Sequence, residues 1–325
     1  MAKLIVRFSR GASTSWGLLS GAAPTGPSDV IEVAPFAFAA STTSELIGKL
    51  DAGESALEGP IAIPAETLLS PITSDGFIFA QGLNYGDHAS EAQQAKRTSN
   101  LIFSKSSSSL TGPYAPILRP SEVELLDYEV ELGLVIRGDL VGRQKITEGT
   151  LGDVVAGVVL CNDVSARDTM FGTTFFQWFR GKGYRTFCPA GPVLWYLEPQ
   201  EVRDALQDIE IKLSVDGNPR QVGHSSQLIW KPLETLNYIT SSMDMHRGDL
   251  LLTGTPGGVT APATPRMVEI LKEHLLADTV RRDELRVEMQ KGRPFLKAGN
   301  LVTATMTGPN GLNLGGLANP VRDED

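Results

Sequence analysis

Residues 127–136, with the sequence DYEVELGLVI, contain the pattern that decides the fold of this 325-residue chain. After Glu131 the stretch continues with leucine, valine and isoleucine around one glycine, which is typical of a buried strand. Residues two apart in a strand point to the same face, so Glu129 and Glu131 project together. Two buried carboxylates this close need a cation or a proton to offset their repulsion. The alternative is a pair of side chains on a solvated strand face.

A third carboxylate stands at the end of another apolar stretch, residues 154–160. Asp163 follows this predicted strand and is well placed to be a third ligand, whereas a turn with Asn162 is the simpler alternative. Carboxylate oxygens are hard donors, which suit Mg²⁺, Mn²⁺ or Ca²⁺ better than Zn²⁺. The three acidic side chains therefore form a candidate site for a hard divalent cation.

The remainder of the chain contains short stretches typical of strands, separated by turns rich in glycine and proline. Further strands are predicted at residues 3–10, 16–19, 29–33, 76–80, 101–103, 150–164, 209–215, 249–253 and 299–306. Helices are predicted over 43–50, from about Tyr85, and over 265–291. Many strands and few helices indicate a β-rich α+β architecture. A change in composition divides it into a small N-terminal β-domain, 1–72, and a larger domain, 73–325.

Composition and charge restrict the class of protein. Hydrophobic residues make up 41% and charged residues 21% of the chain, as in ordinary globular proteins. The net charge is −9 and no cluster of lysine and arginine is present, so nucleic acid is not an expected partner. No apolar run reaches the ~18 residues of a membrane span. The first residues lack a cleavage-site pattern, so we expect a cytoplasmic protein without a membrane partner.

Other positions carry candidate chemistry. His88 and Glu91 are three residues apart, which places them side by side on a helix, where the carboxylate could orient the imidazole as a general base. Lys182 stands between two glycines that allow close approach, and its ammonium could stabilise an oxyanion. Thr255 belongs to a glycine-rich loop that could offer N–H groups and a hydroxyl to a carboxylate. The alternatives are a surface pair, a flexible loop and a plain turn.

Five successive blocks of the sequence, taken in order, resemble the fumarylacetoacetate hydrolase superfamily. They are GLNYGDHASE, DYEVELGLVI, GVVLCNDVSARD, QWFRGKGYRTFCPAGPVL and GDLLLTGTPGGV. The resemblance extends from about Phe77 to Val321. It implies the mixed β-roll of that family, preceded by a small N-terminal β-domain, and assembly as a homodimer.

The resemblance also implies roles for individual residues. The implied ligands of a divalent metal, Mg²⁺ or Mn²⁺ with Ca²⁺ as a further candidate, are Glu129, Glu131 and Asp163. His88 is implied as the catalytic base with Glu91 as its partner, and Lys182 lies near the substrate and the metal. Gln177 and Thr255 match positions that contact substrate in some members. Lys105 matches a lysine in the family's next block after GLNYGDHASE.

Two departures from the family pattern concern the substrate. Arg185 stands where many members have aspartate, which would favour an additional anionic group on the substrate or a merely exposed arginine. Residues 261–293 form an insertion with helical spacing where many members have a short loop. We expect this insertion to shape the entrance of the pocket or a dimer contact.

The predicted function is metal-dependent hydrolysis of a carbon–carbon bond in a 2,4-diketo acid of the acylpyruvate type. A decarboxylase or a keto–enol isomerase acting on a small 2-keto acid is the related alternative, because both need the same enolate stabilisation without an activated water. A non-catalytic binding protein on the same fold is the third hypothesis.

Overall fold

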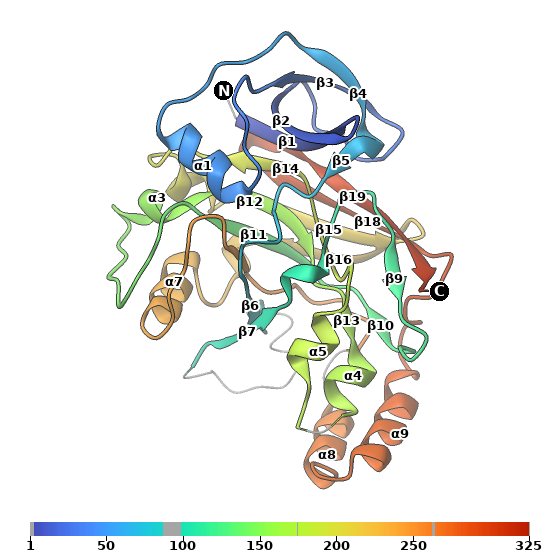
Figure 1. Ribbon diagram of the computed structural model, residues 1–325. Helices are drawn as coiled ribbons and strands as arrows, with labels where there is room; N and C mark the ends of the chain where they lie inside the picture. The colour runs from blue at the N-terminus through green and yellow to red at the C-terminus, as the bar shows by residue number, and fades with distance from the viewer. Residues whose placement is uncertain (1–2, 87–98, 174, 262–263, 325) are drawn as a thin grey trace.

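The computed structural model of the protein describes residues 3–86, 99–173, 175–261 and 264–324. The architecture is α+β and β-rich: a large sheet packs against a five-stranded sheet, and helices cover the outer faces and one end (Figure 1). Over the described residues, every helix falls short of the length and apolar character that crossing a membrane requires.

The large sheet has twelve strands, ten of which form one continuous path. In spatial order these are β4 (Ile61–Pro64), β3 (Val30–Pro35), β2 (Ser13–Ser20), β1 (Lys3–Arg10), β14 (Cys188–Tyr196), β12 (Val155–Asn162), β11 (Val130–Ile136), β17 (Leu250–Leu252), β6 (Ile78–Gly82) and β7 (Leu101–Lys105). Two short strands attach at the side: β5 (Leu68–Leu69) pairs with β1, and β8 (Leu110–Thr111) pairs with β14.

Two smaller sheets complete the β-structure. The five-stranded sheet has the order β16 (Asn218–His224), β15 (Glu210–Val215), β18 (Leu301–Gly308), β19 (Leu312–Asp323) and β9 (Ile117–Arg119). The remaining pair consists of β10 (Leu126–Asp127) and β13 (Ser165–Ala166).

The helices are short and lie outside the sheets. They are α1 (Thr43–Asp51), α3 (Leu151–Val154), α4 (Arg167–Phe171), α5 (Trp178–Lys182), α6 (Val202–Ala205), α7 (Pro232–Thr240), α8 (Pro265–Glu273) and α9 (Asp278–Met289). In Figure 1, α4, α5, α8 and α9 gather at one end of the molecule, below the sheets. This end carries the candidate site.

Strand β11 is buried along its whole length because both of its faces are covered. Leu132 and Leu134 belong to the main core, which also contains Leu213 of the five-stranded sheet. Val135 points the other way, into a second cluster that includes Leu46 of α1. The two-sided packing explains why the sequence after Glu131 is apolar without interruption.

Several predicted elements are confirmed and two are corrected. The helix expected at 43–50 is α1, where the Thr42 hydroxyl accepts from the N–H of Glu45 and caps the first turn. The stretch 150–164 begins as helix α3 before it becomes β12. The single helix expected over 265–291 is two helices, α8 and α9. Arg281 favours the break, because its buried guanidinium donates to the carbonyls of His274 and Leu275 in the turn between the two helices.

The N-terminal strands are continuous with the rest of the large sheet. Strand β1 pairs antiparallel with β14, with Leu4 opposite Trp195 and Ile5 opposite Leu194. The division into domains at 1–72 and 73–325 stays a prediction, and the hydrogen-bonded sheet runs across that boundary.

Candidate metal centre and active site

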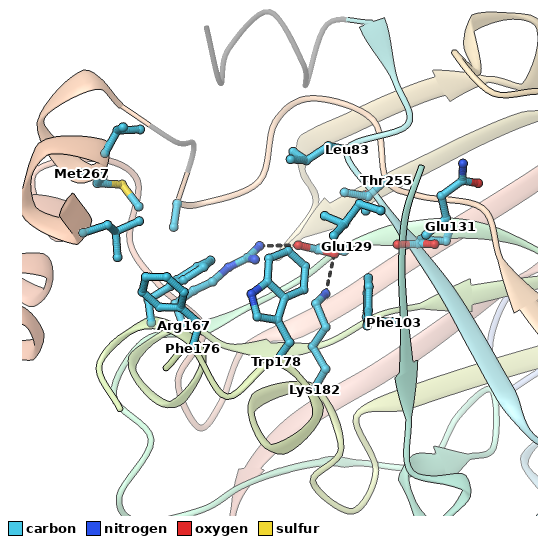
Figure 2. A pocket seen from close by; sticks show the side chains of 17 residues that line it. Leu83, Phe103, Glu129, Glu131, Arg167, Phe176, Trp178, Lys182, Thr255 and Met267 are labelled. Atoms are coloured by element: carbon cyan, nitrogen blue, oxygen red, sulfur yellow. Dashed lines mark hydrogen bonds and ion pairs between the residues drawn. The ribbon is translucent and has the colours of Figure 1, made fainter. Parts of the chain in front are cut away.

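A cavity of about 290 Å³ lies where the ends of β6, β7 and β11 meet the short helices α4 and α5 (Figure 2). Its charged lining consists of Glu129, Glu131, Arg167 and Lys182. Most of the other described lining residues are apolar or aromatic. Such a pocket, largely apolar with a few converging polar groups, is typical of small-molecule sites.

The predicted metal ligands come from two neighbouring antiparallel strands. β11 and β12 pair so that Glu131 lies opposite Cys161. The pairing continues past the end of β12, since the N–H of Asp163 donates to the carbonyl of Glu129 at 2.7 Å. Opposite residues share a face of the sheet, and so do residues two apart in one strand. This register therefore turns all three carboxylates to the same side.

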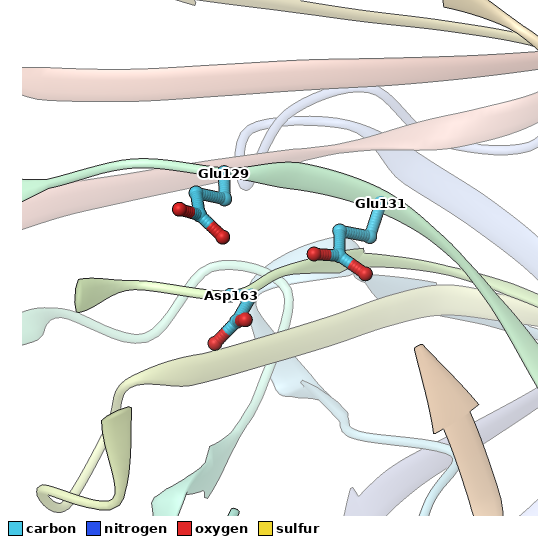
Figure 3. A group of neighbouring side chains, drawn as sticks. All are labelled: Glu129, Glu131 and Asp163. Atoms are coloured by element: carbon cyan, nitrogen blue, oxygen red, sulfur yellow. The ribbon is translucent and has the colours of Figure 1, made fainter. Parts of the chain in front are cut away.

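The three carboxylates form one buried group (Figure 3). One oxygen atom from each of Glu129, Glu131 and Asp163 lies within 4.8 Å of the others. These are hard oxygen donors, which suit Mg²⁺, Mn²⁺ or Ca²⁺. The structure thus brings together the residues that the sequence indicated as a possible metal site.

Buried cations compensate part of this negative charge. The Lys182 ammonium donates to Glu129 Oε2 at 2.8 Å and to Asp163 Oδ2 at 2.5 Å. Arg167 pairs with Glu129 Oε1 at 2.6 Å and with Asp127 at 2.8 Å. Burial by itself would lower the pKa of Lys182, but the charges of Asp163 and Glu129 outweigh it and raise the pKa above its usual value. Lys182 is therefore a charged group at neutral pH.

Glu131 differs from the other two carboxylates in its partners. It accepts a hydrogen bond from the N–H of Gly254 at 2.7 Å, and no described lysine or arginine forms an ion pair with it. Burial, followed by the charges of Asp163 and Glu129, raises the pKa of Glu131 well above its usual value. A divalent cation beside these oxygens would remove this penalty, so the residues present fit a metal.

The local sequence explains how Lys182 reaches the site. It ends the short helix α5, which packs closely against α4. A Cβ at Gly181 would lie 2.3 Å from the Met170 Cγ, so only glycine allows this approach. Gly181 therefore allows α5 to pack against α4. The sequence had indicated only that the glycines beside Lys182 allow a close approach.

Comparison with known proteins identifies the family of this chain. Residues 77–322 match the family model described as fumarylacetoacetate (FAA) hydrolase, C-terminal. The chain belongs to the fumarylacetoacetate hydrolase family. Its β-rich α+β fold is the one expected for that family.

Similar proteins of the fumarylacetoacetate hydrolase family are named after different reactions. A 2,4-didehydro-3-deoxy-L-rhamnonate hydrolase of Sphingomonas sp. (strain SKA58) is 39% identical over 200 residues, which cover 61% of this chain and 67% of that protein. A mitochondrial oxaloacetate tautomerase of Xenopus laevis is 31% identical over 260 residues, covering 78% of this chain and 68% of that protein. For a bovine mitochondrial oxaloacetate tautomerase the matched segment spans 60% of that protein. The chain thus matches about three fifths to two thirds of the length of these relatives.

Solved structures share the whole fold. A fumarylacetoacetate hydrolase from Exiguobacterium antarcticum superposes with a TM-score of 0.73 at 24% identity, with 100% of both chains covered. A 5-carboxymethyl-2-hydroxymuconate delta-isomerase from Mycobacterium smegmatis gives 0.67 at 24% identity, covering 99% of this chain and 100% of that one. At this identity the likeness shows the fold alone.

The other residues assigned from the family pattern are placed differently. Thr255 lines the cavity, and its hydroxyl donates to the carbonyl of Val130 at 2.9 Å. Gln177 is exposed at the start of α5 and is not among the described lining residues. Arg185 is also outside that lining: its side chain is 79% exposed and lies 3.5 Å from Glu324. The contacts of Gln177 and Arg185 with substrate stay predictions.

Lys105 lies beneath the site instead of in the cavity. Its fully buried ammonium donates to Asp163 Oδ1 at 2.6 Å, to the carbonyl of Val164 at 3.3 Å and to the carbonyl of Lys182. It therefore positions two site residues at once. The predicted base and its partner, His88 and Glu91, lie outside the described residues.

Arg167 lies in the cavity wall, although no pattern in the sequence indicated it as a site residue. It begins α4, four residues after Asp163, and is almost fully buried. Burial would lower its pKa, but the charges of Glu129 and Asp127 outweigh this and raise it. The available signal was charge balance, because a cluster of buried carboxylates requires buried cations close by in space.

Proposed function

We propose that this protein is a divalent-metal-dependent hydrolase that cleaves a carbon–carbon bond in a 2,4-diketo acid of the acylpyruvate type. The observation that carries the proposal is the group of three buried carboxylates in the wall of a small cavity, with Lys182 and Arg167 beside them. The carboxylates suit a hard dication, and the positive charge of that dication would favour an anionic substrate.

Glu129, Glu131 and Asp163 are the residues that would hold the metal. A bound Mg²⁺ or Mn²⁺, with Ca²⁺ as a further candidate, supplies Lewis-acid stabilisation of the negative charge that develops on the substrate oxygens. The rest of the proposed chemistry belongs to the protein side chains.

The proposed reaction consumes one water. His88, oriented by Glu91, takes a proton from the water, which adds to the carbonyl carbon distal to the carboxylate. Lys182 stabilises the oxyanion formed there. The bond between this carbon and the methylene then breaks, its electron pair passes into pyruvate enolate, and the enolate accepts a proton at carbon. The products are a carboxylic acid and pyruvate.

Keto–enol tautomerisation is the second candidate, favoured by the names of the tautomerase relatives at 31–36% identity. It would move a proton between carbon and oxygen without adding water. Decarboxylation of a 2-keto acid uses the same stabilised enolate. Hydrolysis is preferred because the relative at 39% identity is named a hydrolase.

One experiment separates these chemistries. The purified protein is stripped with a chelator and given acetylpyruvate with and without Mg²⁺, and the products are identified by NMR. We expect equal amounts of acetate and pyruvate, formed only with the metal. Full activity of the stripped protein would overturn the metal assignment. Enol–keto exchange without acetate would establish the tautomerase, and release of CO₂ would establish a decarboxylase.

The remaining expectations on assembly and partners are also proposals. A small 2-keto acid is the expected partner in the cavity. The family resemblance favours a homodimer, and sedimentation velocity of the purified protein would test it.

A further inference from the structure

The cavity has two chemically different ends. In Figure 2, Glu131, Glu129 and Thr255 lie on one side, with Lys182 below them, while Met267 and Phe176 lie on the other. The four described charged lining residues all belong to the network around the carboxylates. A ligand that spans the cavity therefore meets charge at one end and hydrocarbon at the other.

The hydrocarbon end is built largely by the helical insertion of this chain. Met267, Val268 and Leu271 of α8 line the cavity, together with Ala261 just before that helix. Met267 also packs in a small core with Leu285 of α9. The insertion thus contributes to the wall of the pocket.

A buried arginine holds the two parts of this wall together. Arg281 of α9 is fully buried, and its Nε donates to the carbonyl of Phe171 at 2.7 Å. Its guanidinium also donates to the carbonyl of Thr173 at 2.5 Å and lies 5.4 Å from the centre of the Phe176 ring. Phe171 and Phe176 line the cavity from the α4–α5 segment, so Arg281 fixes their position relative to the insertion. A fixed wall selects ligands by length and shape.

Among the described lining residues, a second carboxylate on the ligand would find no free cationic partner at this end. The nearest lining cation, Arg167, already pairs with Asp127 and Glu129 at 2.8 and 2.6 Å. Placing a charge against methionine, leucine and phenylalanine without a partner is unfavourable. The cavity volume of about 290 Å³ lies at the low end for ligand sites, which limits the size of the apolar group.

From these observations we propose that the substrate is a monocarboxylate with an uncharged apolar acyl group, whose length is set by Val268 and Leu271. This inference rests on the proposed function for the position of the keto-acid head. It names the substrate class of the same site and excludes dicarboxylates as preferred ligands.

The test measures binding, so that it is independent of turnover. Pyruvate, 2-oxobutanoate, 2-oxohexanoate, 2-oxooctanoate and oxaloacetate are titrated calorimetrically into the full-length protein with Mg²⁺ present. We expect the affinity to rise up to about fourfold for each added methylene, which corresponds to ~0.8 kcal/mol, until the cavity is filled. Oxaloacetate should bind more weakly than 2-oxohexanoate.

Two variants locate the apolar end. Val268→Phe should abolish the gain for the longer acids, whereas Leu271→Ala should extend the gain to a longer chain. Both side chains are partly exposed, so folding is expected to survive. Leu276→Ala is the matched control, because Leu276 is 75% exposed on the same insertion and does not line the cavity.

The outcomes separate this inference from the proposed function. An affinity that is flat with chain length, tighter binding of oxaloacetate, an unchanged profile in both variants, or no binding of any of these acids would overturn the inference. A rising profile in a protein that does not hydrolyse acylpyruvates would sustain the substrate class while the hydrolase proposal fails.

Discussion

Replacing Glu131 by glutamine should stabilise the metal-free protein, although it alters a buried residue of the candidate site. Two unit charges 4.8 Å apart repel by about 3 kcal/mol at an effective dielectric constant of ~20. Glu131 faces Glu129 and Asp163, and the attraction of Lys182 reduces the repulsion from these two carboxylates. Protonation of the carboxyl relieves part of the remainder. We therefore expect Glu131→Gln to raise the free energy of unfolding by about 1–3 kcal/mol in chelator.

The same substitution should remove the response to metal. A ligand present at one hundred times its dissociation constant stabilises a native protein by about 2.7 kcal/mol. The wild-type protein should gain an increment of this kind when Mg²⁺ is added, and Glu131→Gln should gain little. The assay is denaturant unfolding followed by tryptophan fluorescence, with EDTA and with Mg²⁺, together with Mn²⁺ titration followed by electron paramagnetic resonance.

Glu129→Gln is the matched control, since it removes a carboxylate of the same group that does have cationic partners. Lys182 and Arg167 would each lose one partner and keep the other, so we expect a loss of about 2–3 kcal/mol in chelator. The two variants thus differ in sign. Equal destabilisation by both substitutions would refute the view that Glu131 is the uncompensated charge in this group.

Three further predictions follow from the same contacts. Because the folded pKa of Glu131 is raised, the native metal-free protein binds more protons than the unfolded chain above the usual glutamate pKa. The free energy of unfolding of the metal-free protein should therefore fall as the pH rises from the usual glutamate pKa to the raised pKa of Glu131. Denaturant unfolding at several pH values should show a smaller decrease for Glu131→Gln than for the wild-type protein. Lys182→Met should lower kcat about 100-fold or more, as expected for loss of an oxyanion donor. Lys212 is exposed, so Lys212→Met should leave kcat unchanged. Equal values of kcat for the two variants would exclude Lys182 as the oxyanion donor. Lys105→Met should lower the free energy of unfolding by about 3 kcal/mol or more, because the ion pair of Lys105 with Asp163, at 2.6 Å, is buried. Lys3→Met should lower it by at most ~1 kcal/mol, because the ion pair of Lys3 with Glu198, at 2.5 Å, is exposed. Similar losses in urea unfolding would contradict this.

The candidate site was predictable from the sequence where local periodicity determines it. The spacing of Glu129 and Glu131 predicted that both carboxylates share one face of a strand, and the apolar residues that follow favoured burial of that strand. Asp163 could be added because a polar residue at the end of a second buried strand lies at the same edge of a sheet. The period of two residues fixes the shared face of Glu129 and Glu131, whereas the place of Asp163 also requires that the two strands pair.

Contacts between distant segments could not be predicted in this way. The position of Lys105 under Asp163 depends on how β7 reaches the site from the far side of the sheet. Arg185 is exposed and lies near Glu324, which is close to the other end of the chain. The break between α8 and α9 involves Arg281 and carbonyls that become available only in the folded turn. Helix and strand periodicity in the sequence does not indicate such long-range contacts.

The pairing of β1 with β14 has a consequence for synthesis of the protein. The first strand leaves the ribosome long before residues 188–196 exist, and at ~5–20 residues per second the wait is about 10–40 s. Throughout this interval the nascent β1–β2 hairpin exposes the edge that β14 will later cover, and an open strand edge invites pairing with other chains. We expect a ribosome-associated chaperone to protect the edge of β1 until β14 has been synthesised.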